Sequence, residues 1–154
     1  MYSTILVLHS IIRWLVLTFL LYSIYRVYIG YTYKKNYSKT DNSFRHWTAT
    51  IAHIQLMLGM ILYFQSPVVK SFWSNTKTSI LNFDAVFYGL IHMALMFIAI
   101  IVLTIGSALA KRKLTDKEKF KTTLVWFCVA LFIILIAIPW PFSPLASRPI
   151  YRVF

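Results

Sequence analysis

The apolar stretches of this sequence contain side chains that can bind metal or carry charge, and we single out four of them: His9, Arg13, His53 and His92. His9 and Arg13 are four positions apart, which is just over one turn of a helix and places both on one face. His53 and His92 stand in two later apolar stretches. Ionisable side chains are expensive at membrane depth and mark functional sites there, so these four residues are the candidates for chemistry.

The composition is that of an integral membrane protein. Of 154 residues, 59% are hydrophobic and 13% are charged, and the mean hydropathy is +0.68. No water-soluble domain of this length tolerates such a surface. The net charge of +12 would suggest nucleic acid in a soluble chain, but here the basic residues lie between apolar segments, where they set topology and meet anionic lipid headgroups. We therefore expect the lipid bilayer as a partner and no nucleic acid.

Four apolar segments are long enough to cross a bilayer as helices. They cover residues 5–28, 47–64, 85–110 and 122–139. Backbone polar groups must be paired in lipid, and none of the segments alternates as a barrel strand does. The sequence thus predicts an all-α fold, a four-helix up-down transmembrane bundle that forms a single domain over residues 1–154. The closely spaced Pro139 and Pro141 should end the fourth helix.

Basic residues are unevenly shared between the two ends of the expected bundle. The connections after the first and third segments hold ten Lys and Arg residues, whereas the second connection and the tail hold four. By the positive-inside rule, the two basic connections lie in the cytoplasm and both termini lie outside. For the outer linker 65–83 we expect an irregular loop anchored by Phe72 and Trp73, with a segment lying flat on the membrane as the alternative.

The depths of the histidines decide which of them can share a cofactor. His9 lies about one turn, and His92 about two turns, below the same outer end, so their depths differ by only a few Å at 1.5 Å per residue. The first and third helices of an up-down bundle face each other diagonally. His9 and His92 are therefore the expected axial ligands of one iron, in a b-type haem. Gly89 and Ala99 would leave room for the macrocycle, and close helix packing is the alternative explanation of these small residues.

Arg13 and His53 have separate roles in this hypothesis. Arg13 would meet a haem propionate or Asp84, either of which offsets the cost of its charge in the membrane. His53 lies about two turns above the inner end of its helix, too low to share an iron with His92. A second haem at His53 remains open. A metal centre without haem is disfavoured, because no carboxylate lies at membrane depth beside these histidines.

The order of these motifs resembles a known family. The motifs are Leu8-His9-Ser10 with Arg13-Trp14, Ala52-His53-Ile54-Gln55 with Gly59 and Leu62-Tyr63 before Ser66-Pro67, His92 with Met96, and the closing Ile138-Pro139-Trp140-Pro141-Phe142. Over nearly the whole chain they are similar to the small bacterial four-helix membrane proteins labelled cytochrome b. The resemblance implies a bacterial inner membrane protein that transfers electrons through b-type haem held by His9, His53 and His92. Members can carry a further histidine after the glycine matching Gly106; this chain has Ser107, which argues against an inner haem.

Three functions are compatible with the sequence. The first is a membrane-bound b-type cytochrome with one haem in the outer leaflet, passing electrons between the quinone pool or a partner enzyme and an acceptor outside. The second is a haem-modifying or quinol-oxidising enzyme in which His53 and Arg13 handle protons. The third is a cofactor-free accessory subunit of a larger respiratory or membrane complex, with the histidines as hydrogen-bond partners between helices. We expect the first, an electron carrier or subunit rather than a stand-alone enzyme.

Overall fold

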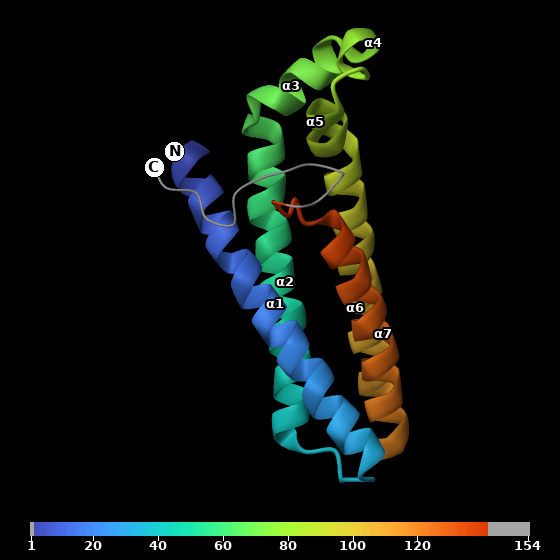
Figure 1. Ribbon diagram of the computed structural model, residues 1–154. Helices are drawn as coiled ribbons and strands as arrows, with labels where there is room; N and C mark the ends of the chain where they lie inside the picture. The colour runs from blue at the N-terminus through green and yellow to red at the C-terminus, as the bar shows by residue number, and fades with distance from the viewer. Residues whose placement is uncertain (1, 142–154) are drawn as a thin grey trace.

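The computed structural model describes residues 2–141 of the chain. Four long helices dominate this part, which contains no β-strand (Figure 1). They are α1 (Tyr2–Thr32), α2 (Lys39–Gln65), α6 (His92–Arg112) and α7 (Asp116–Ala137). The predicted all-α four-helix bundle is confirmed.

Two of the long helices begin with a reciprocal pair of capping hydrogen bonds. The Ser38 hydroxyl accepts from the backbone N–H of Asp41, and the Asp41 carboxylate accepts from the Ser38 N–H. Thr115 and Glu118 repeat the arrangement at the start of α7. Such a pair satisfies two backbone donors that the first turn leaves free. Both helices therefore begin in the polar connections, several residues before the apolar segments that the sequence indicates.

The end of α7 follows from its prolines. Ile138 has an extended backbone, with ψ at 129°, because a residue before proline avoids helical geometry. The helix ends at Ala137, so the predicted stop is confirmed and only the boundary of segment 122–139 shifts. The expectation that the C-terminal tail lies outside the membrane concerns residues 142–154, which are not among those described.

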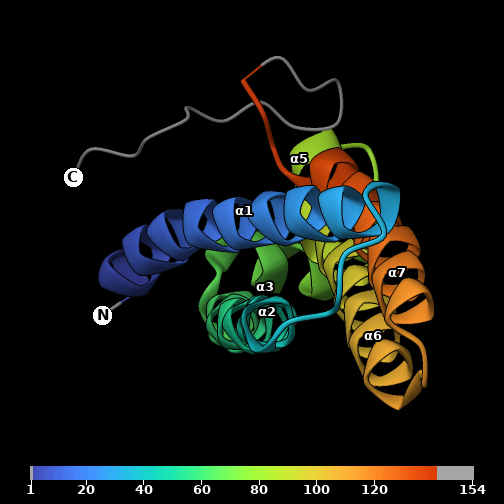
Figure 2. The same cartoon turned by 90° about the horizontal axis from the view of Figure 1, so that it is seen from below.

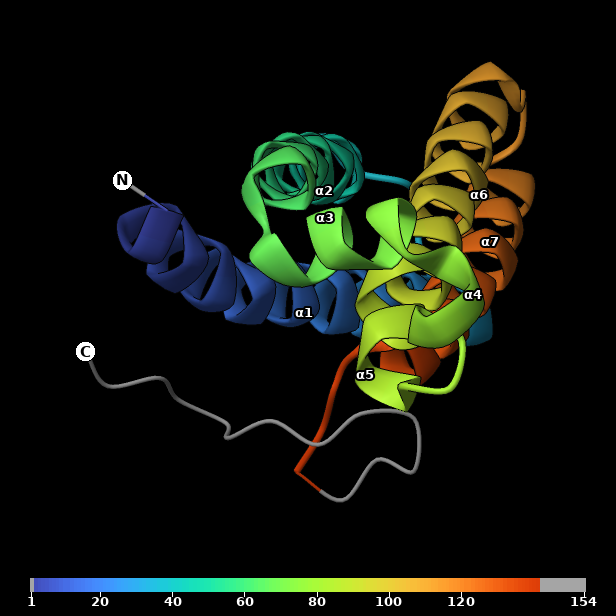
Figure 3. The same cartoon turned by 90° about the horizontal axis from the view of Figure 1, so that it is seen from above.

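The linker 65–83 is mainly helical, so the expected irregular loop is wrong. It contains α3 (Pro67–Ser74) and α4 (Thr76–Ser79), and α5 (Phe83–Val86) follows. Seen from above in Figure 3, α3 crosses the end of the bundle. Ser66 caps α3 and Pro67 occupies its first turn, where a missing N–H costs nothing. Val69 and Phe72 are buried, so local capping and apolar burial together fold this segment.

The long helices run alternately up and down. Helix α1 packs against α2 and α7, and α6 packs against α7 and α2, which places α1 and α6 diagonally as expected. Seen from below in Figure 2, α1 crosses the bundle at an angle, with its N-terminus away from α6 and α7. The connections 33–38 and 113–115 lie together at one end, here called the basic end. Helices α3 to α5 lie at the opposite end, here called the α3 end.

The interior of the bundle is apolar and takes residues from every long helix. Fully buried members are Leu20 of α1, Ala52 of α2, Leu103 of α6 and Phe127 of α7. A buried hydrogen bond of 2.7 Å between the hydroxyls of Ser23 and Thr48 joins α1 to α2. Pairing two hydroxyls in this way removes the cost of burying either one alone.

The outward faces of the helices are also apolar. Large exposed side chains include Leu21, Phe64, Phe97 and Phe132. Four helical spans are long and apolar enough to cross a membrane: Tyr2–Thr32, Lys39–Gln65, Phe83–Arg112 and Asp116–Ala137. A surface of this kind is stable against lipid rather than water. By the length and composition of its helices, this is a membrane protein.

Candidate functional site

His9 lies in the N-terminal part of α1, toward the α3 end. Its ring packs on α2, since a Cβ added at Gly59 would lie 3.2 Å from Cε1 of His9. The side-chain amide of Gln55 donates to the His9 carbonyl oxygen at 2.9 Å. The Nδ1 atom of His9 is buried and has no hydrogen-bond partner among residues 2–141. The imidazole is thus held by packing and keeps a ring nitrogen unused.

His92 begins α6 directly after a π-helical turn, η1 (Phe87–Ile91). Such turns occur often at functional sites. Nδ1 of His92 lies 2.7 Å from the carbonyl oxygen of Ala137, so it must be the donor, because a carbonyl oxygen only accepts. That carbonyl belongs to the last residue of α7, where no intrahelical partner exists. The bond orients the ring, and Nε2 of the neutral imidazole then carries the lone pair that can bind a metal.

The structure brings His9 and His92 together from diagonal helices. The two rings lie within electrostatic range of each other, and Arg13 lies within range of both. The guanidinium of Arg13 stands 5.4 Å from the centre of the Trp14 ring, and Tyr88 is a further polar neighbour of Arg13. Three of the four residues singled out in the sequence therefore form one cluster.

His53 lies apart from this cluster and uses both ring nitrogens. Its Nδ1 lies 2.7 Å from the Ala49 carbonyl oxygen, to which it donates. Its Nε2 lies 3.1 Å from the hydroxyl oxygen of Thr104, on α6, and that hydroxyl also lies 2.6 Å from the Ile100 carbonyl oxygen, a second acceptor for its single proton. Because α2 and α6 are joined by this contact, ligation of a metal by His53 would break a hydrogen bond between helices. The arrangement is the interhelical role that the sequence left as an alternative.

The small residues near His92 are closely packed. A Cβ added at Gly89 would lie 2.5 Å from Cδ1 of Phe72, so the ring from α3 occupies that side. Gly89 also offers its carbonyl oxygen to the Tyr63 hydroxyl at 2.9 Å. Ala99 is fully buried in the bundle interior. In this structure Gly89 and Ala99 serve close packing, which was the alternative explanation of their size.

A polar residue that sequence reasoning missed lies toward the basic end. Arg45 is one of the ten basic residues that the sequence assigns to the connections, yet it belongs to α2 and is 5% exposed. Its guanidinium donates to the Ser107 carbonyl oxygen at 2.8 Å, to the Ser107 hydroxyl and to the Asn42 side chain. The spacing could have revealed it, because the buried Thr48 and Ala52 follow three and seven positions later on the same helix face.

No group of three or more His, Cys, Asp or Glu side chains that could hold a metal ion is found within residues 2–141. His9 and His92 suit a different kind of site, in which two imidazoles complete the coordination of a porphyrin iron. Comparison with models of known protein families, with curated proteins and with solved structures finds no match for this chain. A functional assignment therefore depends on the residues of the site.

Proposed function

We propose that this chain is a membrane-bound b-type cytochrome in which His9 and His92 are the axial ligands of one haem. The proposal rests on their placement: two imidazoles on diagonal helices lie within electrostatic range of each other inside a membrane bundle. The donor set suits the group, because His9 has a buried ring nitrogen without a partner and His92 is oriented by the Ala137 carbonyl. Two neutral imidazoles are suitable axial ligands for a haem iron.

Bound haem would supply reversible one-electron transfer, and the protein would tune it. The hydrogen bond from His92 to Ala137 fixes the ring and increases the basicity of its other nitrogen. Arg13 contributes a positive charge to the same cluster, which suits a propionate. Electrons would pass between the quinone pool, or a partner enzyme, and an acceptor outside.

The proposed location follows from charge. The two basic connections lie at one end of the bundle, and the positive-inside rule assigns that end to the cytoplasm. The cluster of His9 and His92 then belongs to the outer half of a bacterial inner membrane. The same arrangement fits the resemblance to small bacterial proteins labelled cytochrome b.

A cofactor-free accessory subunit is the second candidate, favoured by the filled interior. Phe72 occupies the space at Gly89, and both ring nitrogens of His53 have partners, Ala49 on its own helix and Thr104 on α6. A macrocycle at His92 would have to displace packed side chains. In this alternative, His9 and His92 only hold helices together within a larger complex.

The two candidates are separated by haem content. The protein should be purified in a mild detergent from cells supplied with a haem precursor, and its haem and protein should be quantified together. We expect about one haem per chain and a six-coordinate, low-spin spectrum in both oxidation states. A folded, helical preparation without haem would reject the cytochrome and favour the accessory subunit.

A further inference from the structure

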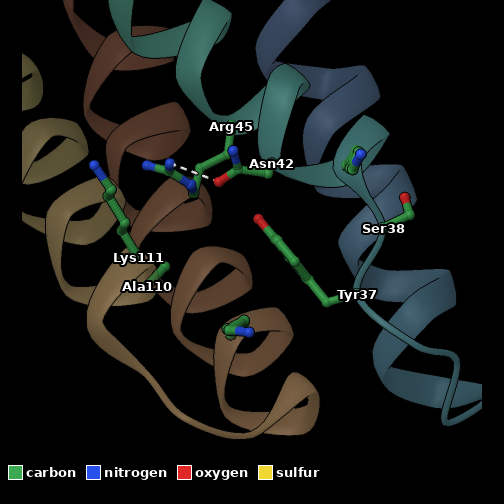
Figure 4. Close-up of a pocket in the computed structure, with 8 residues that line it drawn as sticks. Tyr37, Ser38, Asn42, Arg45, Ala110 and Lys111 are labelled. Carbon is green, nitrogen blue, oxygen red and sulfur yellow. Dashed lines mark hydrogen bonds between the residues drawn. The ribbon is translucent and has the colours of Figure 1, made fainter.

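A polar pocket opens at the basic end of the bundle (Figure 4). Its volume is ≈ 320 Å³, within the range of small-molecule sites. It lies between the first connection, α2, the end of α6 and the beginning of α7. Its lining residues are Tyr37, Ser38, Lys39, Asn42, Arg45, Ala110, Lys111 and Lys119. The pocket is therefore lined by residues from each segment that meets at the basic end.

The pocket has an excess of positive charge. Four of its lining residues are cationic: Lys39, Arg45, Lys111 and Lys119. Among the described residues, Lys119 is the one of these four that forms an ion pair, with Asp116 at 3.5 Å. Asp41 is close by, but its two carboxylate oxygens accept from Arg26 and from Ser38. Acidic residues of the chain thus leave most of this charge unbalanced.

Arg45 is the pocket's buried cation, and no acidic side chain neutralises it among the described residues. Only 5% of its surface is exposed. The groups that accept its hydrogen bonds, on Ser107 and Asn42, are all neutral. Its Nε atom has no partner among the described residues. A buried guanidinium without a carboxylate is unfavourable, because neutral dipoles only partly replace its hydration. An anion in the pocket would supply the missing compensation.

Tyr37 adds a neutral donor to the same site. In Figure 4 its hydroxyl points toward the side chains of Arg45 and Asn42. It lies near Arg45 and Thr123 but has no partner at hydrogen-bond geometry among the described residues. Burial raises the pKa of Tyr37, although the nearby Arg45 charge opposes that effect. The hydroxyl therefore stays protonated at neutral pH and is available to an acceptor.

We propose that this pocket binds a phosphate group, carried either by an anionic lipid headgroup or by a soluble phosphate. Phosphate oxygens accept strong hydrogen bonds from guanidinium and ammonium groups. Basic pockets between transmembrane helices suit anionic headgroups, which are present at the depth of a helix end. The site is independent of the proposed haem, because none of its lining residues belongs to the histidine cluster.

The test compares two double variants that remove the same charge from the same end. Lys39→Gln with Lys111→Gln removes two charges from the pocket, whereas Lys113→Gln with Lys117→Gln removes two exposed charges outside it. Phosphatidylglycerol is titrated into the full chain in maltoside micelles at constant salt, and bound lipid is counted by native mass spectrometry. We expect the pocket variant to bind at least about tenfold more weakly than wild type, and the control to change less than about threefold.

A second arm identifies the source of the phosphate group. The thermal midpoint of lipid-free protein is measured in sodium phosphate and in sodium chloride of equal ionic strength. Protection by phosphate that the pocket variant loses assigns the site to a soluble phosphate; protection by the lipid alone assigns it to a headgroup. Tyr37→Phe, which changes no charge, should weaken whichever binding is seen by about threefold or more.

Two results would overturn the proposal. Equal losses in the pocket variant and the control variant would mean that binding is a diffuse attraction to the basic end. Absence of binding in both arms, with wild-type protein that is folded and helical, would show that the pocket has no phosphate ligand. Because the lysines are exposed, these variants keep the test independent of any folding defect caused by replacing Arg45.

Discussion

His9, His53 and His92 differ in what their ring nitrogens do. His53 donates to its own helix and contacts Thr104 on α6. His92 donates to the end of α7. His9 has a buried nitrogen without a partner among the described residues. The role of a histidine does not follow from its residue type alone. It depends on which hydrogen-bond partners the fold places within about 3 Å of each ring nitrogen.

Replacement of Thr104 by Val should weaken the contact between α2 and α6. The expected loss of stability is about 0.5 to 1.5 kcal/mol, the usual range for a hydrogen bond between membrane helices. Unfolding in mixed detergent micelles measures it. Thr50→Val is the matched control, because within residues 2–141 the Thr50 hydroxyl bonds to the His46 carbonyl of its own helix and to no other helix. Equal effects of both substitutions, or no coupling of Thr104 to His53 in a double-mutant cycle, would contradict the interhelical role.

Replacement of Arg13 by Leu should lower the midpoint potential of the proposed haem. Loss of a nearby positive charge favours the oxidised form, and the shift should be on the order of tens of mV. Redox titration of the purified variant measures it. Lys113→Gln, which removes a charge at the basic end, should leave the potential nearly unchanged. An unaltered potential with normal haem content in the Arg13 variant would exclude a role beside the propionates.

At the scale of elements, close contact between helices depends on glycine. A Cβ added at Gly106 of α6 would lie 2.1 Å from Cβ of Trp126 on α7. At Gly30 of α1, the added atom would meet the Phe120 ring at 2.3 Å. Absence of a side chain at these points lets helix backbones approach, as is common in membrane bundles.

The substitution Gly106→Ala should therefore separate α6 from α7. Since Cβ of Trp126 is fixed to its helix, the new methyl cannot be accommodated by a side-chain rotation. We expect a destabilisation of about 1 to 3 kcal/mol in detergent unfolding, despite the higher helix propensity of Ala. Ala108→Leu adds more volume on an exposed face and should change stability by less than about 0.5 kcal/mol. If Ala108→Leu destabilised the protein more than Gly106→Ala, the close contact between Gly106 and Trp126 would not be what limits stability.

The long helices could be predicted from the sequence. The hydrogen-bond partners of the helix ends and the packing partners of the side chains could not. Apolar length marks a span, whereas caps such as Thr115 lie in polar sequence that also suits a loop. In the candidate site, the depth count could predict that His9 and His92 lie at a similar height in the bundle, because depth depends only on helix rise. The acceptor Ala137 and the filling ring Phe72 come from distant parts of the chain, and only the folded packing shows them.

At the scale of the whole molecule, the bundle has two chemically different ends. One end carries the basic connections and the polar pocket that contains Arg45. The other carries α3 and lies nearer to the cluster of His9 and His92. From the charge at one end we expect a fixed direction across the membrane, because basic residues are generally retained on the cytoplasmic side.

Reporter fusions test this direction. A reporter before residue 2 and one after residue 154 should both be active outside, and one inserted in the connection 113–115 should be active in the cytoplasm. Paired reporters, one active on each side, exclude failure of expression as an explanation. A cytoplasmic reporter at the C-terminus would contradict the up-down arrangement with both termini outside.

The spectrum of the histidine variants tests the central claim most directly. His9→Leu and His92→Leu should each abolish the low-spin signal of the purified protein, because six-coordinate iron needs both imidazoles. His53→Leu should keep that signal and lose only about 1 kcal/mol of stability, since its ring joins helices through Thr104. Loss of haem in the His53 variant together with retention in the His9 variant would contradict the pairing of His9 with His92.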